Sequence, residues 1–187
     1  MKKNKTYDII YMDPPWDYKG RQIVSHNNQK NPDGSWIETS TVEDHYPTMT
    51  DQQLKDLPIN DMLSDDALVF MWIGTPILHR AMDIATHWGL QYSTIGFVWD
   101  KQRIVPGYYT LSSCEMVFIF KKGKIPKPRG SRKVRQFFSE KRREHSRKPD
   151  EIRNRIEEMF PTQTKLEMFA RTTSPGWDVW GNEVDKF

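Results

Sequence analysis

The sequence YDIIYMDPPWDYKG, residues 7 to 20, places an apolar run directly before an acid, two prolines and a tryptophan. Tyr7–Met12 has the length and composition of a strand buried on both faces, and Asp13 follows at its end. Proline fixes its own backbone torsion and has no N–H group, so Pro14 and Pro15 are expected to form a rigid corner. The sequence therefore predicts a carboxylate held at the carboxyl end of a strand, where ligands bind in open α/β sheets.

Strand-like and helix-like segments alternate along the rest of the chain. The further predicted strands are Ala67–Trp72, Tyr92–Trp99, Glu115–Phe120 and Lys165–Phe169. The predicted helices are Thr50–Leu57, Pro76–Trp88 and Pro149–Phe160. This alternation indicates an α/β fold with crossover connections between the strands of one sheet. There is no internal repeat and no linker, so we expect residues 1–187 to form a single domain.

Local patterns support the ends of two predicted helices. Thr50 with Gln53 three residues later matches a capping box. Pro76 stands in the first turn of the next helix and Gly89 just past its end, which is the usual placement of these residues.

Two long stretches lack any periodicity and are predicted to be loops. Residues 19–45 are rich in Asn, Ser, Gly and Asp, and residues 121–147 are basic and contain two Gly and two Pro. Loops of this length in a compact domain are usually functional or disordered. We expect both to flank the mouth of a site at Asp13 and to bind substrate.

The charge of the chain is unevenly distributed. Between Lys121 and Lys148 there are 13 Lys or Arg and two acids, whereas the remainder has 15 bases and 23 acids. A basic block on an otherwise acidic protein favours a polyanionic partner such as nucleic acid. The alternative is a solvated surface loop.

Composition excludes several classes of protein. The single cysteine, Cys114, excludes an internal disulfide and a Cys-based zinc site. The five histidines show no metal-ligand spacing, so we expect no metal. No apolar run approaches the ~18 residues of a membrane span, and no signal peptide is recognisable. We expect an intracellular protein with no membrane partner.

The DPPW corner suits methyl transfer to the amino group of adenine. This amine is a poor nucleophile because its lone pair is delocalised into the ring. Asp13 and the carbonyl of Pro14 can accept its two N–H bonds, and Trp16 can stack on the base. A sulfonium methyl donor would be held in line with the nitrogen. Two alternatives remain. Trp16 could be a core residue that anchors a rigid turn, or the corner could belong to an enzyme that methylates cytosine or a glutamine amide.

A second stretch completes a recognisable pattern. HSRKPDEIRNRIEEMFPTQTKLEMFARTTSPGWDVWGNE, residues 145–183, together with DPPW resembles the MT-A70 family, which includes the catalytic subunit of the eukaryotic mRNA adenine methyltransferase and bacterial and phage relatives. HYPTMT, ALVFMWIGTP, HWGL, FVWDK and EMVFIF extend the match. The resemblance implies a Rossmann-like fold for S-adenosylmethionine (SAM)-dependent methyltransferases, in a permuted order with the catalytic motif N-terminal and the cofactor segment C-terminal.

The resemblance also implies roles for individual residues. The catalytic turn would be Asp13, Pro14, Pro15 and Trp16. The substrate adenine would be bound by Tyr46, Trp99, Lys101 and Glu115. SAM, whose product is S-adenosylhomocysteine, would be bound by Asp13, Lys148, Met168, Phe169, Arg171, Thr173, Asn182 and Glu183. Within this set, Lys148 would reach the carboxylate of SAM, and Arg171, Asn182 and Glu183 would hold the ribose and nearby groups.

These roles have simpler structural alternatives. Lys148 would then be one more charge of the basic block, and Arg171 a salt bridge at a strand end. Trp177 and Trp180 are expected to pack in the core. Larger family members also carry residues upstream of the catalytic strand that help hold the cofactor adenine; seven residues precede Asp8 here, so we expect that wall to be missing or supplied otherwise.

The leading functional hypothesis is a SAM-dependent N(6)-adenine methyltransferase acting on DNA in the cytoplasm of a bacterial or phage-infected cell. The runner-up is the same reaction on RNA. A non-catalytic nucleic-acid-binding scaffold that pairs with another methyltransferase is the alternative of a different class, and the intact DPPW argues against it. Family habit suggests a homodimer or a paired methyltransferase subunit.

Overall fold

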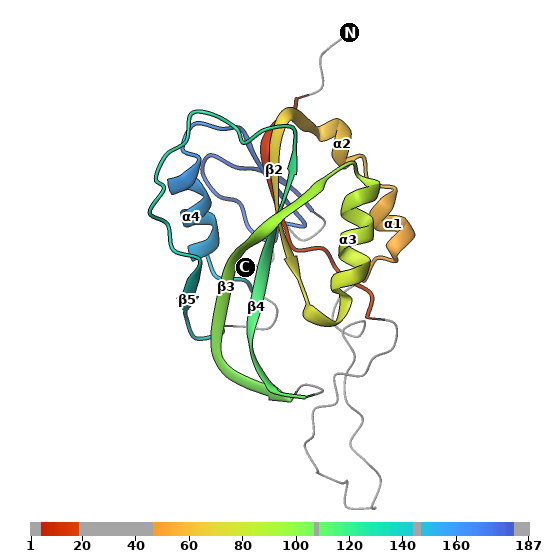
Figure 1. The fold of residues 1–187 in the computed structure, drawn as a ribbon, viewed down its shortest axis with the longest axis vertical. Helices are drawn as coiled ribbons and strands as arrows, with labels where there is room; N and C mark the ends of the chain where they lie inside the picture. The colour runs from red at the N-terminus through yellow and green to blue at the C-terminus, as the bar shows by residue number, and fades with distance from the viewer. Residues whose placement is uncertain (1–4, 19–46, 107–108, 144–146, 182–187) are drawn as a thin grey trace, which may run out of the picture.

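The computed structural model describes residues 5–18, 47–106, 109–143 and 147–181, and within them the strands form one mixed sheet (Figure 1). The strands are β1 (Tyr7–Met12), β2 (Leu63–Ile73), β3 (Gln91–Pro106), β4 (Leu111–Lys122), β5 (Phe137–Ser139), β6 (Lys165–Met168) and β7 (Asp178–Trp180). The helical elements are α1 (Asp51–Lys55), α2 (Ile59–Met62), the 3-10 turn η1 (Thr75–Ile77), α3 (Leu78–His87) and α4 (Glu151–Met159). The spatial order of the strands is β5-β3-β4-β2-β1-β6-β7.

The sheet places the two ends of the sequence beside each other. β1 pairs in parallel with β2 and with β6, and β6 pairs in parallel with β7. The register between β1 and β6 runs from Ile9 opposite Lys165 to Met12 opposite Met168. The strand that ends at Asp13 therefore lies next to the strand of the C-terminal motif, which is the permuted Rossmann-like order expected for this chain.

The other half of the sheet departs from the expected crossover pattern. β4 is antiparallel to both β2 and β3, and β3 and β4 make a long hairpin (Figure 1). Both strands are longer than the predicted apolar segments because their polar ends continue the hairpin beyond the buried part of the sheet.

All five predicted strands are present, but two strands and one helix were missed. β5 and β7 are three residues long, and α2 has four residues, so none leaves a periodic signal. β5 lies inside 121–147, so the prediction that this whole stretch is loop is wrong. The loop predicted at 19–45 lies outside the described residues.

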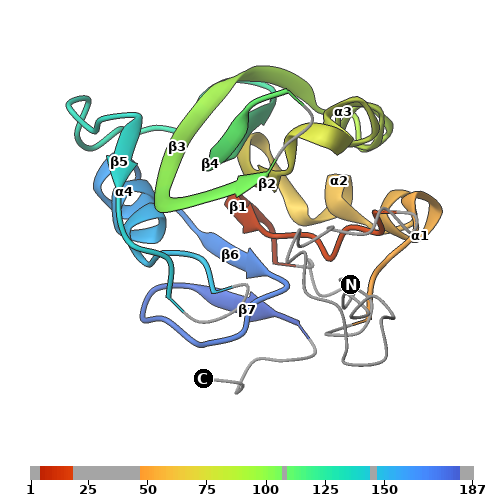
Figure 2. The same ribbon diagram turned by 90° about the horizontal axis from the view of Figure 1, so that it is seen from below.

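The helices cover both faces of the sheet, with α1, α2 and α3 on one side and α4 on the other (Figure 2). Thr50 forms the predicted capping box with Gln53, and Gly89 ends the α3 segment with a φ of 77°. Alternate residues of β1 face opposite cores: Ile10 and Met12 pack with α1–α3, whereas Ile9 and Tyr11 face α4. In the described part of the chain, no helix has the length and apolar character needed to cross a membrane.

Candidate active site

The DPPW corner is fixed by its own backbone hydrogen bonds. The N–H of Trp16 donates to the carbonyl of Pro14 at 2.8 Å, and the N–H of Met49 donates to the carbonyl of Pro15 at 2.8 Å. These bonds leave the Asp13 carboxylate at the carboxyl end of β1, partly exposed. The corner therefore needs no rearrangement to present that carboxylate.

Trp16 is a buried residue of the core. Its side chain is 4% exposed, and its indole N–H donates to the backbone carbonyl of Trp72 at 3.1 Å. The expectation that Trp16 stacks on the base is wrong for this structure, because its ring packs between the sheet and α1–α3. The alternative, a core anchor that holds the rigid turn, is what the structure contains.

Four charged side chains from distant parts of the sequence meet at Asp13. The ammonium of Lys148 lies 3.4 Å from Asp13 Oδ2 and 2.9 Å from Glu115 Oε2, and Lys101 lies 3.3 Å from Glu115 Oε1. Asp13 comes from the corner directly after β1, Lys101 from β3, Glu115 from β4, and Lys148 from the segment before α4. Three of the predicted substrate and cofactor residues thus form one alternating chain of charges with the predicted catalytic acid.

The charge cluster shifts the pKa of each of three members. Burial raises the pKa of Asp13, with Lys148 opposing this and Glu115 adding to it. Burial alone would raise the pKa of Glu115 as well, but Lys148 and Lys101 outweigh it and lower that pKa to about 2. Burial tends to lower the pKa of Lys148, but Asp13 and Glu115 raise it above its ordinary value. Glu115 and Lys148 therefore stay charged near neutral pH. Of the three shifted groups, Asp13 is the one whose ionised form is disfavoured by its surroundings.

A pocket opens beside this cluster, between β1, β6 and the start of α4. Its lining residues are Tyr11, Asp13, Arg147, Lys148, Pro149, Asp150, Arg153, Glu167, Met168, Phe169, Arg171 and Thr172. Five predicted cofactor residues are among them, namely Asp13, Lys148, Met168, Phe169 and Arg171. Thr172 takes part in the lining where Thr173 was expected.

The remaining predicted site residues fall into two groups. Tyr46, Asn182 and Glu183 lie outside the described residues. Trp99 is 3% exposed, packs edge-on against Trp72 with ring centroids 6.1 Å apart, and donates its N–H to the carbonyl of Glu140. Its place in the core next to α4 argues against direct contact with a base.

Trp177 is also a core residue, as expected, but Trp180 is 42% exposed, with its ring edge-on against that of Phe169.

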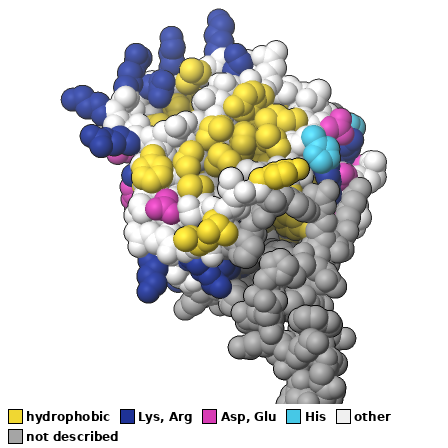
Figure 3. All heavy atoms as spheres, turned by 60° about the horizontal axis from the view of Figure 1, so that its bottom comes forward, with side chains coloured by type: hydrophobic (Ala, Val, Ile, Leu, Met, Phe, Trp, Pro, Cys, Tyr) yellow, Lys and Arg dark blue, Asp and Glu magenta, His cyan; other side chains and the backbone are white. Residues whose placement is uncertain are grey.

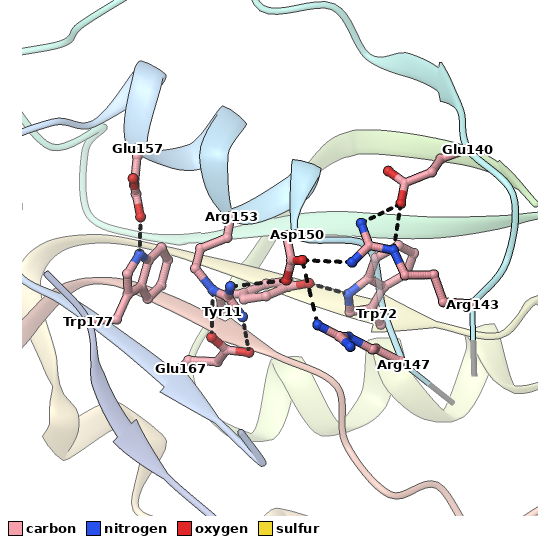
Figure 4. Close-up of polar contacts among 10 residues, drawn as sticks. All are labelled: Tyr11, Trp72, Glu140, Arg143, Arg147, Asp150, Arg153, Glu157, Glu167 and Trp177. Carbon is pink, nitrogen blue, oxygen red and sulfur yellow. Dashed lines mark hydrogen bonds and ion pairs between the residues drawn. The ribbon is translucent and has the colours of Figure 1, made fainter. Parts of the chain in front are cut away.

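Sequence reasoning missed a polar network under the pocket (Figure 4). Arg153 on α4 binds Glu167 on β6 through two bonds of 2.9 and 3.2 Å, and also lies 3.4 Å from Asp150. Arg143 reaches Asp150 at 2.9 Å. Tyr11 lies in the middle of this network, opposite Glu167 in the β1–β6 register. The network links α4 to the sheet at the pocket wall.

The residues of the pocket fit a cofactor such as SAM. Its amino-acid end carries a carboxylate and an ammonium group, and the lining supplies both cations (Arg147, Lys148 and Arg171) and carboxylates. Met168 and Phe169 provide apolar surface for an adenosine group. Among the residues that the structure describes, no three His, Cys, Asp or Glu side chains are grouped to hold a metal ion.

Comparison with known proteins agrees with this geometry. The chain is 42% identical over 183 residues to the Type II methyltransferase M.MunI of Mycoplasma sp, covering 96% of this chain and 78% of that protein. It is 26% identical over 192 residues to the human N(6)-adenosine-methyltransferase catalytic subunit METTL3, and 27% identical over 192 residues to the MT-A70-like N(6)-adenosine-methyltransferase of Arabidopsis thaliana. The chain spans only 28% and 24% of those two proteins.

The family model MT-A70 matches residues 7–183, which begin with β1 and include the DPPW corner, the charge cluster and the pocket. The match covers nearly the whole chain and agrees with the Rossmann-like arrangement of the sheet. This chain belongs to the MT-A70 family of methyltransferases.

Proposed function

We propose that this chain transfers a methyl group from SAM to the 6-amino group of adenine in DNA. The observation that carries the proposal is the position of Asp13: its carboxylate lies at the edge of the pocket, on a rigid corner, 3.4 Å from a lysine that is itself shared with Glu115. Membership of the MT-A70 family supports the reaction type.

The corner is suited to activating an aromatic amine. The Asp13 carboxylate accepts one N–H bond of the amine and the Pro14 carbonyl accepts the other, which draws the nitrogen lone pair away from the ring. The Pro14 carbonyl already accepts the N–H of Trp16, and its second lone pair is available for the amine. Because both acceptors belong to a fixed turn, they are in place before the base arrives.

The pocket residues would hold the cofactor beside this corner. Lys148 would bind the carboxylate of its amino-acid end, Arg171 would hold the ribose and nearby groups, and Met168 and Phe169 would contact the adenosine group. We propose that Asn182 and Glu183 bind the ribose of the cofactor. We propose that Tyr46, Lys101 and Glu115 surround the adenine substrate. When bound, SAM supplies an electrophilic methyl group on its sulfonium.

The basic block supports nucleic acid as the substrate. In the described residues between Lys121 and Arg143, the exposed bases are Lys124, Lys127, Arg129, Arg132, Lys133, Arg135, Lys141 and Arg143. Figure 3 shows Lys and Arg side chains projecting along one border of the face that it views. Phosphate contacts by such residues would make binding steeply salt-dependent. The greater similarity to the Type II methyltransferase than to the adenosine methyltransferases favours DNA over RNA.

The test is incubation of the purified protein with methyl-labelled SAM and matched adenine-containing duplex DNA, single-stranded DNA and RNA. Because duplex adenine must be flipped out of the stack, the two DNA forms also report strand preference. We expect N(6)-methyladenine in DNA after digestion and mass spectrometry. Label found in RNA alone would overturn the DNA assignment and keep the chemistry. Bound SAM with no label would indicate a missing partner or target sequence, and no SAM binding would favour the scaffold.

We also propose that two copies of the chain associate through the β3–β4 hairpin. Ile104, Tyr109 and Leu111, near the turn of this hairpin, are exposed large hydrophobic residues, and the face seen in Figure 3 carries a broad hydrophobic area. Exposed apolar area of this kind marks interaction sites. Light scattering at assay concentration should give twice the mass of the chain, and Ile104→Glu should give the monomer. A fully active monomer would contradict the proposal.

A further inference from the structure

Tyr11 is a buried hydroxyl in the pocket that no predicted role includes. It lies in β1, two residues before Asp13, and faces the side of the sheet that α4 covers, and both residues line the pocket. The side chain is 4% exposed and is held by edge-on contact with Trp177, with ring centroids 6.1 Å apart. Tyr11 therefore sits in a fixed position on the pocket wall.

The hydrogen-bond chemistry of Tyr11 leaves one hydrogen for a ligand. Its hydroxyl oxygen lies 2.7 Å from the indole nitrogen of Trp72 (Figure 4). An indole N–H can only donate, so Tyr11 is the acceptor in this bond. Among the described residues, no protein group accepts the hydrogen of the Tyr11 hydroxyl. Trp72 is already a partner of the hydroxyl oxygen, and the hydroxyl can still donate its own hydrogen to a ligand or a water in the pocket.

The hydroxyl keeps that hydrogen over the working range of pH. Burial raises the pKa of Tyr11 far above its ordinary value, and the carboxylates of Glu167 and Asp13 act in the same direction. Tyr11 is therefore a neutral donor placed among charged groups. The carboxylates around it are already engaged: Glu167 is bound by Arg153, and Asp13 by Lys148.

We propose that Tyr11 is a further cofactor-binding residue, which donates its hydroxyl hydrogen to the carboxylate at the amino-acid end of the cofactor. This inference rests on the proposed function, because it takes SAM as the occupant of the pocket. The charged part of the lining that surrounds Tyr11 matches the amino-acid end, whereas Met168 and Phe169 match the adenosine end. A carboxylate is the strong acceptor at the amino-acid end, and a donor to it forms a charge-assisted bond.

The test compares two ligands on Tyr11→Phe by calorimetry. S-adenosylhomocysteine has the amino-acid end, and 5′-methylthioadenosine lacks it. We expect the Kd for S-adenosylhomocysteine to rise about 10- to 100-fold, as for loss of one hydrogen bond to a charged group, and the Kd for methylthioadenosine to change less than about twofold. Tyr7→Phe is the matched control. Tyr7 is on the same strand as Tyr11 but outside the pocket, and its hydroxyl donates a hydrogen bond of 2.7 Å to Asp178 on β7. Removing this hydroxyl should leave the Kd of both ligands unchanged.

Three outcomes would overturn the inference. Equal weakening of both ligands would mean that Tyr11 only shapes the pocket, and no weakening of either would mean that its hydrogen meets no ligand. A wild-type chain that binds neither ligand would refute the proposed cofactor itself, which is a separate result. The Tyr11→Phe variant leaves the Trp72 N–H without its acceptor, which could prevent folding. In that case the two ligands are compared on Trp72→Phe and on the double variant Trp72→Phe/Tyr11→Phe, which differ only in the Tyr11 hydroxyl.

Discussion

Replacing Asp13 with alanine is expected to lower the turnover of methyl transfer at least about 1,000-fold, because we propose that this carboxylate accepts an N–H bond of the amine and so activates it. The affinity for S-adenosylhomocysteine should fall only modestly, since Lys148, Arg171 and the apolar wall remain. Single-turnover assays with labelled SAM measure the first quantity, and calorimetry the second. This separation of turnover from binding distinguishes a catalytic acid from a structural one.

Asp8→Ala provides the matched control for Asp13→Ala. Asp8 lies at the opposite end of the same strand, where its carboxylate accepts the backbone N–H and the hydroxyl of Thr164, each at 3.0 Å. We expect this variant to lose some stability and to keep near-normal turnover. If Asp13→Ala also keeps near-normal turnover, the catalytic turn has been assigned to the wrong residues.

Replacing Arg153 with methionine should cost the folded state about 3 kcal/mol at neutral pH, because it leaves Glu167 charged and without its partner. The two side chains are 13% and 12% exposed and join α4 to β6 at the pocket wall. Urea unfolding at pH 7 measures the loss. Because the ion pair holds α4 against β6 at the pocket wall, the variant should also bind the cofactor more weakly than the wild type.

The loss in Arg153→Met should shrink as the pH is lowered. Burial already raises the pKa of Glu167, and Arg153 opposes that shift, so the variant raises this pKa further. A group whose folded pKa lies above its unfolded value takes up a proton first in the folded state, so its penalty is lost as the pH falls through the folded pKa. Adding Glu167→Gln should recover most of the stability at pH 7. A loss that is independent of pH and persists in the double variant would assign the effect to packing.

The sequence alone was sufficient to predict β1, the rigid corner that follows it and the position of the Asp13 carboxylate at the end of the strand. Periodicity and proline chemistry are local properties, and they identified Tyr7–Met12 with the correct ends and Thr50 as a cap. The same local reasoning did not detect the three-residue strands β5 and β7, whose extended conformation depends on the edges they pair with. It also could not separate a stacking Trp16 from a buried one, since both satisfy the same pattern.

Local sequence patterns are enough to place Asp13 on a rigid corner at the end of a buried strand and to reveal the resemblance to the MT-A70 family. The identity of the groups that meet Asp13 follows only from the folded chain. Glu115 and Lys148 are 33 residues apart, and Tyr11 and Glu167 become neighbours only through the β1–β6 register. Contacts of this kind arise from strand pairing and packing between distant segments, which no local pattern of residues encodes.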